Sequence, residues 1–222
     1  METELKLSFP NQQTLYAASE APWFLDALRI ISEKTFVFEN RYLDTRERSL
    51  RDSGTTIRIR HVDGENYIHT VKTGPVALPS GSDPNLLSGL TSRCEWNVET
   101  EKPEFDIGFF LASSKNAQDP YETLAATLVP LMGKDLVTLS KTAFTRHVIT
   151  AEFEGSILEI CLDTGACYGG GKSLPICEME IELIFGDVAS VTGLGEIIRA
   201  NADCEPLAIS KLARCLKLMN EE

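Results

Sequence analysis

Charged and apolar residues alternate along many segments of this chain. The stretches "ETELKL" at 2–7 and "EMEIEL" at 178–183 are clear examples, with a charged residue at every second position. Residues two apart on a β-strand point to the same side, so such segments form strands with one charged and one apolar face. The same alternation predicts eight strands, at 2–9, 36–44, 55–62, 65–73, 93–101, 143–152, 156–163 and 176–185.

Apolar residues recur at helical spacing in four further segments, 19–33, 120–132, 188–201 and 205–219. In the first of these, Ser19 fits the helix N-cap and Pro22 fits the first turn. Short turns such as "VDGEN" and "FEGS" join neighbouring strands, which favours antiparallel pairing. No repeat or linker divides the chain, so we predict a single α+β domain over 1–222. The Gly-, Pro- and Ser-rich residues 74–92 are then a mobile excursion within that domain.

Two architectures fit strands that have one charged and one apolar face. In the first, the charged face meets bulk water, as in an ordinary half-exposed antiparallel sheet. In the second, the sheet closes into an eight-stranded antiparallel β-barrel, with the charges in its lumen and helices packed on its outside. We favour the closed barrel because closure removes exposed sheet edges and because amphipathic helices are available to cover the apolar faces. Acidic residues also concentrate on the first and last strands, with basic residues on those between.

Composition limits the classes of partner. The 222 residues carry a net charge of −12, so the overall field repels nucleic acid and anionic membranes. No apolar run is long enough to span a bilayer, and the N-terminus lacks the pattern of a secretory signal. We therefore predict a cytoplasmic protein that binds neither nucleic acid nor membrane. The six cysteines form no C-x-x-C pair and are expected to be reduced, mostly buried thiols.

The alternating glutamates predict a bound cation. Like charges side by side destabilise a sheet, so a counter-ion is expected between the acidic rows of the first and last strands. Carboxylate oxygens without a Cys or His partner suit hard cations such as Mg²⁺ or Mn²⁺. Arg and Lys suit phosphate oxygens. A lumen that holds both suits a metal–polyphosphate complex, and phosphoryl transfer needs mainly positioning and charge stabilisation.

These residues resemble a known family. The segment "ETELK" at 2–6 matches the E-x-E-x-K opening of the CYTH superfamily, the triphosphate tunnel metalloenzymes. The match continues in order through "TIRIR" (56–60), "HTVKT" (69–73), "SRCEWNVE" (92–99), "FTR" (144–146), "LEICLDTG" (158–165), "ICEMEIEL" (176–183) and "ISKLAR" (209–214). The chain looks most like bacterial inorganic triphosphatases. The resemblance implies a tunnel that binds a linear triphosphate and cleaves it to pyrophosphate and phosphate with Mg²⁺ or Mn²⁺.

Carried over residue by residue, the resemblance implies two sets of site residues. The metal carboxylates would be Glu2, Glu4, Glu178 and Glu180, with Asp163 as a helper. The triphosphate-binding residues would be Lys6, Arg58, Arg60, Lys72, Arg146 and Lys211, with Arg93 and Arg214 as additions. As the catalytic group, Lys72 or Lys211 would position or deprotonate the attacking water. Many members have a lysine shortly before the arginine of the "FTR" strand, where this chain has Phe144.

Other functions could use the same charged residues. A class IV adenylate cyclase would act on ATP in the same tunnel, but the sequence shows no evident adenine pocket. A thiamine triphosphatase would need an aromatic residue at the tunnel mouth. A non-catalytic polyphosphate or nucleotide sensor could lose the carboxylates, whereas this chain has the complete acidic set. The stretch "YGGGKS" (168–173) lacks the spacing of a P-loop and is predicted to be a hairpin connection.

Overall fold

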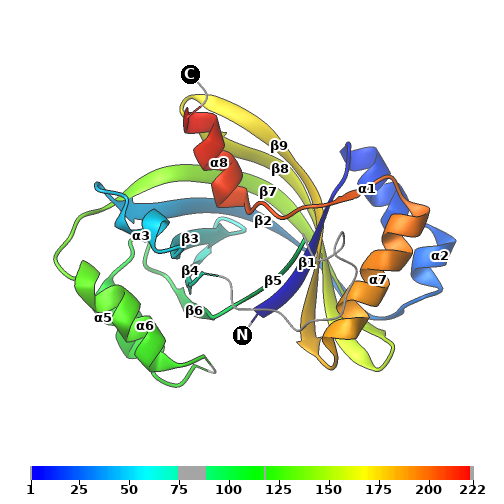
Figure 1. Cartoon of the computed structure of the whole chain (residues 1–222), viewed down its shortest axis with the longest axis horizontal. Coiled ribbons are helices and arrows are strands. Elements are labelled where there is room, and N and C mark those ends of the chain that lie inside the picture. Colours follow the sequence, from blue (N-terminus) through cyan, green and yellow to red (C-terminus); the bar gives the residue numbers. More distant parts are fainter. Residues whose placement is uncertain (1, 75–88, 118, 221–222) are drawn as a thin grey trace.

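The computed structural model describes residues 2–74, 89–117 and 119–220, and a curled antiparallel sheet is its main feature (Figure 1). The strands are β1 (Glu2–Ser8), β2 (Arg29–Thr45), β3 (Thr56–Val62), β4 (Asn66–Lys72), β5 (Leu90–Arg93), β6 (Glu95–Thr100), β7 (Leu136–Phe153), β8 (Ser156–Gly169), β9 (Lys172–Phe185) and β10 (Glu205–Pro206). The helices are α1 (Gln12–Ser19), α2 (Pro22–Leu25), α3 (Ser49–Asp52), α5 (Ile107–Ser113), α6 (Tyr121–Leu128), α7 (Val188–Asn201) and α8 (Lys211–Asn220). The predicted α+β class is therefore confirmed.

Adjacent pieces of chain pair with strands near the two ends of the sheet. Its strands run in the order β10-β1-β9-β8-β7-β2-β3-β4-β6, and β5 pairs with β1 off this path. Only Cys94 separates β5 from β6, which pairs with β4 at the other end of the path. The predicted strand 93–101 corresponds to β6, with Arg93 as the last residue of β5. Because β5 and β10 add to the predicted strands, the described residues form a ten-stranded sheet rather than an eight-stranded one.

Apolar clusters pack helices onto this sheet and leave the charged face turned inward. Helices α1, α2 and α7 cover side chains such as Ile160 and Ile181, and α5 and α6 cover Trp96. These two groups of helices lie at opposite sides of the molecule in Figure 1. Burying one large apolar side chain contributes about 1.5–3 kcal/mol, so the three clusters together stabilise the curl. In the third cluster, Leu218 of α8 packs with Phe144 of β7.

The predicted helix over 19–33 is wrong. Ser19 is the last residue of α1, Pro22 begins the single turn α2, and β2 begins at Arg29. Strand β2 pairs with β7 along its length, so its backbone hydrogen bonds run to the neighbouring strand and not along a helix. Tertiary pairing therefore overrides the helical spacing of the apolar residues in this segment.

Two other predicted helices are confirmed, and a further one is shorter than expected. Segments 120–132 and 188–201 form α6, with the 3₁₀ turn Val129–Leu131 after it, and α7. The segment 205–219 begins with β10 and becomes helical only at Lys211. Because α8 packs against β7, β8 and β9, its first residue is brought to the sheet.

The glycine-rich stretch "YGGGKS" is a hairpin turn, as predicted. Strand β8 ends at Gly169 and β9 begins at Lys172. The two residues between them, Gly170 and Gly171, have φ angles of 57° and 74°. Positive φ at both central residues is typical of a two-residue hairpin turn, and glycine adopts it without strain.

The predicted excursion over 74–92 is only partly covered by the structure. Residues 90–92 belong to β5, so that part of the prediction is wrong, and residues 75–88 lie outside the described part of the chain. Among the described residues, every helix is too short or too polar to cross a bilayer.

Candidate active site in the central cavity

The charged face of the sheet lines a cavity of about 1000 Å³. The predicted site residues that line it are Glu2, Glu4, Lys6, Arg58, Arg60, Lys72, Arg93, Arg146, Glu180 and Lys211. Asp163 and Glu178 are fully buried and contact Lys211, and Arg214 contacts Glu178. The structure therefore gathers all of the predicted site residues in one region.

Three carboxylates from two adjacent strands meet in this region. Asp163 of β8 lies opposite Glu178 of β9, and Glu180 follows two residues later on the same face. Each of the three offers an oxygen atom, and these atoms lie within 4.8 Å of one another. We call Asp163, Glu178 and Glu180 the acidic triad. Three carboxylates can lie this close together because basic side chains surround them.

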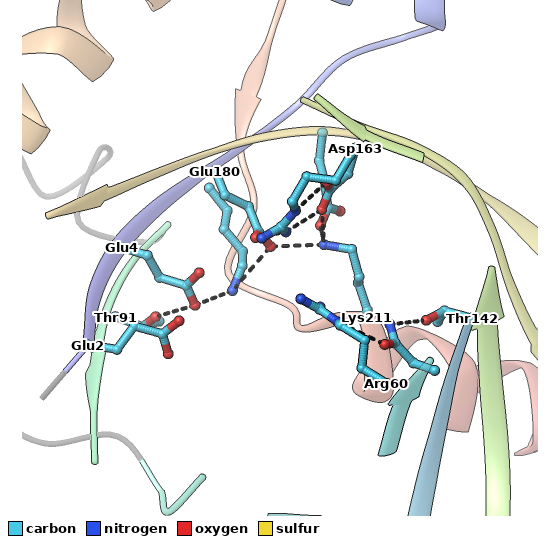
Figure 2. A network of polar contacts seen from close by, with 12 residues as sticks. Glu2, Glu4, Arg60, Thr91, Thr142, Asp163, Glu180 and Lys211 are labelled. Atoms are coloured by element: carbon cyan, nitrogen blue, oxygen red, sulfur yellow. Dashed lines mark hydrogen bonds and ion pairs between the residues drawn. The ribbon is translucent and has the colours of Figure 1, made fainter. Parts of the chain in front are cut away.

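Lys211 and Arg146 neutralise the acidic triad. Lys211 Nζ lies 2.7 Å from Asp163 Oδ2 and 2.9 Å from Glu180 Oε1, and it also pairs with Glu178 (Figure 2). Arg146 donates from Nε and Nη2 to the two oxygens of Asp163, at 2.7 and 2.6 Å, and pairs with Glu180 as well. The first residue of α8 thus occupies the centre of the triad.

This arrangement keeps Asp163 and Glu180 ionised. Burial pushes the pKa of Glu180 upward, but Lys211, Arg146 and Lys6 outweigh it and hold the pKa well below its usual range. Burial likewise raises the pKa of Asp163, and Arg146 and Lys211 reverse that shift and lower it. These side chains are therefore carboxylates at neutral pH, as ligands for a hard cation must be.

A second charged group lies along β1, β4 and β6. Lys72 Nζ is 2.6 Å from Glu2 Oε2 and 2.6 Å from Glu95 Oε2. Lys6 pairs with Glu4 and lies 3.7 Å from Glu180 Oε1, so it connects this group to the acidic triad. Glu2 and Glu4, which were predicted to hold the metal with the others, are not among the described carboxylates whose oxygens lie within 4.8 Å of one another.

Glu95 belongs to this site, although sequence reasoning did not assign it a role. Besides Lys72, it meets Arg58, whose Nη2 lies 3.8 Å from Glu95 Oε1. Burial raises the pKa of Glu95, but Lys72 and Arg58 outweigh it and hold the pKa far below its usual value. The signal was present in the sequence, since Glu95 follows Arg93 by two residues and shares its face.

Arg60 and Phe38 line the cavity, and Phe144 is buried behind them. Arg60 Nε donates to Asn40 Oδ1 at 3.0 Å, and its guanidinium lies 4.0 Å from the centre of the Phe38 ring. Phe144 meets the edge of Phe38, with ring centres 5.6 Å apart, and its own ring centre is 5.0 Å from Lys211 Nζ. This chain therefore places an aromatic ring, that of Phe144, close to Lys211.

The effect of burial on the charged residues of the cavity can be tested at Glu182. Burial raises its pKa from the usual 4.5 to about 7, Lys72 opposes the shift and Glu4 adds to it. Because the folded pKa exceeds the unfolded one, the resulting stabilisation is complete below about pH 4.5 and is lost as the pH rises through 7. The Gln variant has no charge to lose or gain. Relative to the native protein, we therefore expect the free energy of unfolding of Glu182→Gln to be higher at pH 8.5 than at pH 5 by roughly 1–2 kcal/mol, or about 4 °C in Tm, after a discount for partial exposure.

Thermal unfolding in EDTA at both pH values measures this gain. Glu65→Gln, an exposed carboxyl in the β3–β4 turn, is the matched control and should show no pH-dependent difference. An equal difference between Glu182→Gln and native protein at the two pH values would contradict the raised pKa.

Comparisons of the sequence with known proteins give a consistent result. A family model described as the CYTH domain matches residues 1–216. An inorganic triphosphatase from Haemophilus influenzae is 29% identical over 221 residues, which cover 96% of this chain and 53% of that protein. The chain therefore spans about half the length of this curated relative.

Solved structures match over nearly the whole chain. A Hippeastrum protein, described as an adenylyl cyclase that reveals a dominant triphosphatase activity, has a TM-score of 0.66 at 22% identity, with 99% of this chain and 97% of that chain covered. A Pyrococcus horikoshii protein has a TM-score of 0.55 at 19% identity, covering 98% and 99%. A Bacillus halodurans protein described as an adenylate cyclase has a TM-score of 0.55 at 18% identity, covering 95% of each chain. At these identities the likeness shows the fold alone.

Proposed function

Because this chain belongs to the CYTH domain family, we propose that it hydrolyses inorganic triphosphate to pyrophosphate and phosphate with Mg²⁺ or Mn²⁺. The observation that carries the proposal is the acidic triad, which lies beside Lys6, Arg146 and Lys211 in a single cavity. Oxygen ligands for a hard cation and donors for phosphate oxygens are thus available at the same place. The name of the Haemophilus influenzae relative and the description of the Hippeastrum protein support the same reaction.

The acidic triad fits a divalent cation. Its donors are all carboxylate oxygens, the ligand type that Mg²⁺ and Mn²⁺ prefer, and they are close enough to share one ion. When bound, such an ion neutralises phosphate charge and activates a water molecule. In the proposal, Asp163, Glu178 and Glu180 hold it. Lys211 must then leave the centre of the triad, and its ammonium becomes available to a phosphate oxygen.

The cavity supplies charge for the phosphate groups. Arg146 and Arg58 line the cavity, and among the described residues the Nε atom of Arg58 is buried without a partner. Arg93 Nε is likewise buried and unpartnered among the described residues. Buried donors of this kind are costly unless something binds them, and phosphate oxygens match the forked geometry of arginine. We assign these side chains to orient the triphosphate for in-line attack.

The surroundings of Lys72 and Lys211 favour a role as positive charges over a role as general bases. Burial lowers the pKa of Lys72, but Glu2 and Glu95 outweigh it and raise the pKa above its usual value. Burial also lowers the pKa of Lys211, and Asp163 and Glu178 raise it well above the usual value. Ammonium groups stabilised in this way do not take a proton from water near pH 7. We therefore propose that both lysines position the substrate or water and stabilise developing charge.

The proposal includes a closed tunnel. The pairing of Glu2 with Arg93 at one end of the sheet path and of Lys72 with Glu95 at the other supports closure through the segment around Cys94. A tunnel wall around the phosphates would exclude water from all but the reacting position and would strengthen each charged contact.

One product analysis tests this function against its alternatives. Tripolyphosphate, ATP and thiamine triphosphate are each incubated with Mg²⁺ or Mn²⁺, and the products are followed by ³¹P NMR. We expect phosphate and pyrophosphate from tripolyphosphate, and much slower turnover of the other two substrates. Cyclic AMP from ATP would instead indicate a cyclase, preferred cleavage of thiamine triphosphate would indicate a thiamine triphosphatase, and binding without product would indicate a sensor.

A further inference from the structure

Arg60 differs in its partners from the basic residues that meet the carboxylates of the cavity. Lys6, Lys72, Arg146 and Lys211 each form an ion pair with at least one carboxylate. Arg60 lines the same cavity, but no carboxylate among the described residues forms an ion pair with it. Its side chain is therefore a half-buried cation that forms no ion pair within the part of the chain that the structure describes.

Neutral groups hold Arg60 in place. Its Nε donates to Asn40 Oδ1 at 3.0 Å, and Asn40 Nδ2 donates in turn to Thr142 Oγ1 at 2.9 Å (Figure 2). Asn40 and Thr142 are each only 1% exposed. The Phe38 ring supports one face of the guanidinium at 4.0 Å from its centre. A guanidinium carries five N–H donors, and among the described residues only the Nε of Arg60 has a hydrogen-bond partner, so the donors on the two terminal nitrogens are available to a ligand.

The neutrality of Asn40 is the important feature. An aspartate at this position would have nearly the same shape and could accept the same hydrogen bond, but it would also neutralise the guanidinium. Burial and the neighbouring charges of Arg58 and Arg146 lower the pKa of Arg60 to about 9, and the opposing influences of Tyr42 and Asp163 are too weak to offset them. An incoming anion relieves this repulsion, so the local field favours oxyanion binding.

We propose that Asn40 is a positioning residue that fixes the guanidinium of Arg60 and keeps it uncompensated, so that Arg60 binds one phosphoryl group without the help of a metal ion. This proposal rests on the proposed function, because it assigns the first contact of the same polyphosphate substrate. It also assigns a role to a residue that lies outside the charged rows of the sequence. The acidic triad and the Arg60 subsite then bind different parts of one ligand.

Calorimetric titration with tripolyphosphate in EDTA measures the metal-free contact. We expect Asn40→Asp to bind at least about tenfold more weakly than the native protein, because the new carboxylate pairs with Arg60. Asn40→Ala loses the anchor but leaves the guanidinium uncompensated, so binding weakens by about three- to tenfold. Asn66→Asp adds the same charge at an exposed position lining the cavity and is the matched control, with binding expected within about twofold of native protein.

The order of these effects separates positioning from a merely structural role. If Asn40 only maintained the fold, Asn40→Ala would be the more damaging variant, because Asp keeps the hydrogen bond to Arg60 Nε. In steady-state assays with Mg²⁺, we expect Asn40→Asp to raise KM by about tenfold or more and to change kcat by less than about threefold. Thermal unfolding confirms that each variant is folded, and Asn40→Ala alone carries the test if Asn40→Asp does not fold.

Two outcomes overturn the proposal in distinguishable ways. In the first, Asn40→Ala and Asn40→Asp bind tripolyphosphate in EDTA as tightly as the native protein does. This result would overturn the role of Asn40 and leave the proposed function intact. Absence of tripolyphosphate binding by the native protein, both in EDTA and with Mg²⁺, would overturn the proposed function and this inference together.

Discussion

Glu180→Gln is expected to reduce turnover of tripolyphosphate by at least about 10³-fold. Glu180 is the junction of the site, since its carboxylate contacts Lys211 at 2.9 Å and Lys6 at 3.7 Å and also pairs with Arg146. The amide removes one oxygen ligand of the proposed metal site and leaves three buried cations with less counter-charge. Steady-state assays with Mg²⁺ and Mn²⁺ at saturating substrate measure the loss.

A matched control separates this loss from a general effect of charge. Glu99→Gln makes the same change at an exposed side chain that lines the same cavity and should keep turnover within about threefold of native protein. Breaking a buried ion pair also destabilises a protein, by about 3–5 kcal/mol, so thermal unfolding must show that Glu180→Gln is folded at the assay temperature. A folded Glu180→Gln that keeps more than about a tenth of native turnover would contradict the assigned role.

Lys72→Met and Lys211→Met are expected to lower kcat by about 10²-fold or more, because each removes a buried positive charge near the proposed phosphate path. The corresponding arginine variants separate charge from proton transfer. Arginine keeps the charge but cannot act as a base near neutral pH, so Lys72→Arg and Lys211→Arg should recover part of the loss if the lysines act as cations. The raised pKa of Lys72, whose partners Glu2 and Glu95 lie outside the acidic triad, is the reason to expect this result at that position.

The measurements are kcat at saturating tripolyphosphate and its dependence on pH. Full turnover in both methionine variants would show that neither lysine takes part in the reaction. Arginine variants as inactive as the methionine variants, together with a native rate that rises across neutral pH with a lysine-like pKa, would indicate that a lysine acts as a base.

The sequence predicted the composition of the site better than its internal pairing. Alternation along β1 and β9 places Glu4, Lys6 and Glu180 on one face, because side chains two apart on a strand share a side wherever the strand ends. The same rule could not show that Lys211 would lie within the acidic triad. That contact depends on how α8 packs against β8 and β9, which is a tertiary arrangement without a local pattern.

Asn40 and the segment 19–33 illustrate two further limits. Asn40 lies on the face of β2 that meets Arg60, but an uncharged residue among charged rows gives no sign of a special role before its partner is known. In 19–33, apolar residues at helical spacing predicted a helix, and long-range pairing with β7 made its second part the beginning of β2. Local periodicity competes poorly with a partner strand of this length.

The proposed reaction requires that a divalent cation and a triphosphate occupy the cavity together. A crystal structure of the protein soaked with Mn²⁺ and a slowly hydrolysed triphosphate, with anomalous diffraction recorded for manganese, tests this point. We predict an anomalous peak within coordination distance of Asp163, Glu178 and Glu180, Lys211 displaced from the triad, and phosphate oxygens on Arg60 and Arg146. Manganese and ligand bound only on the outer surface, with Lys211 still paired to all three carboxylates, would contradict the account.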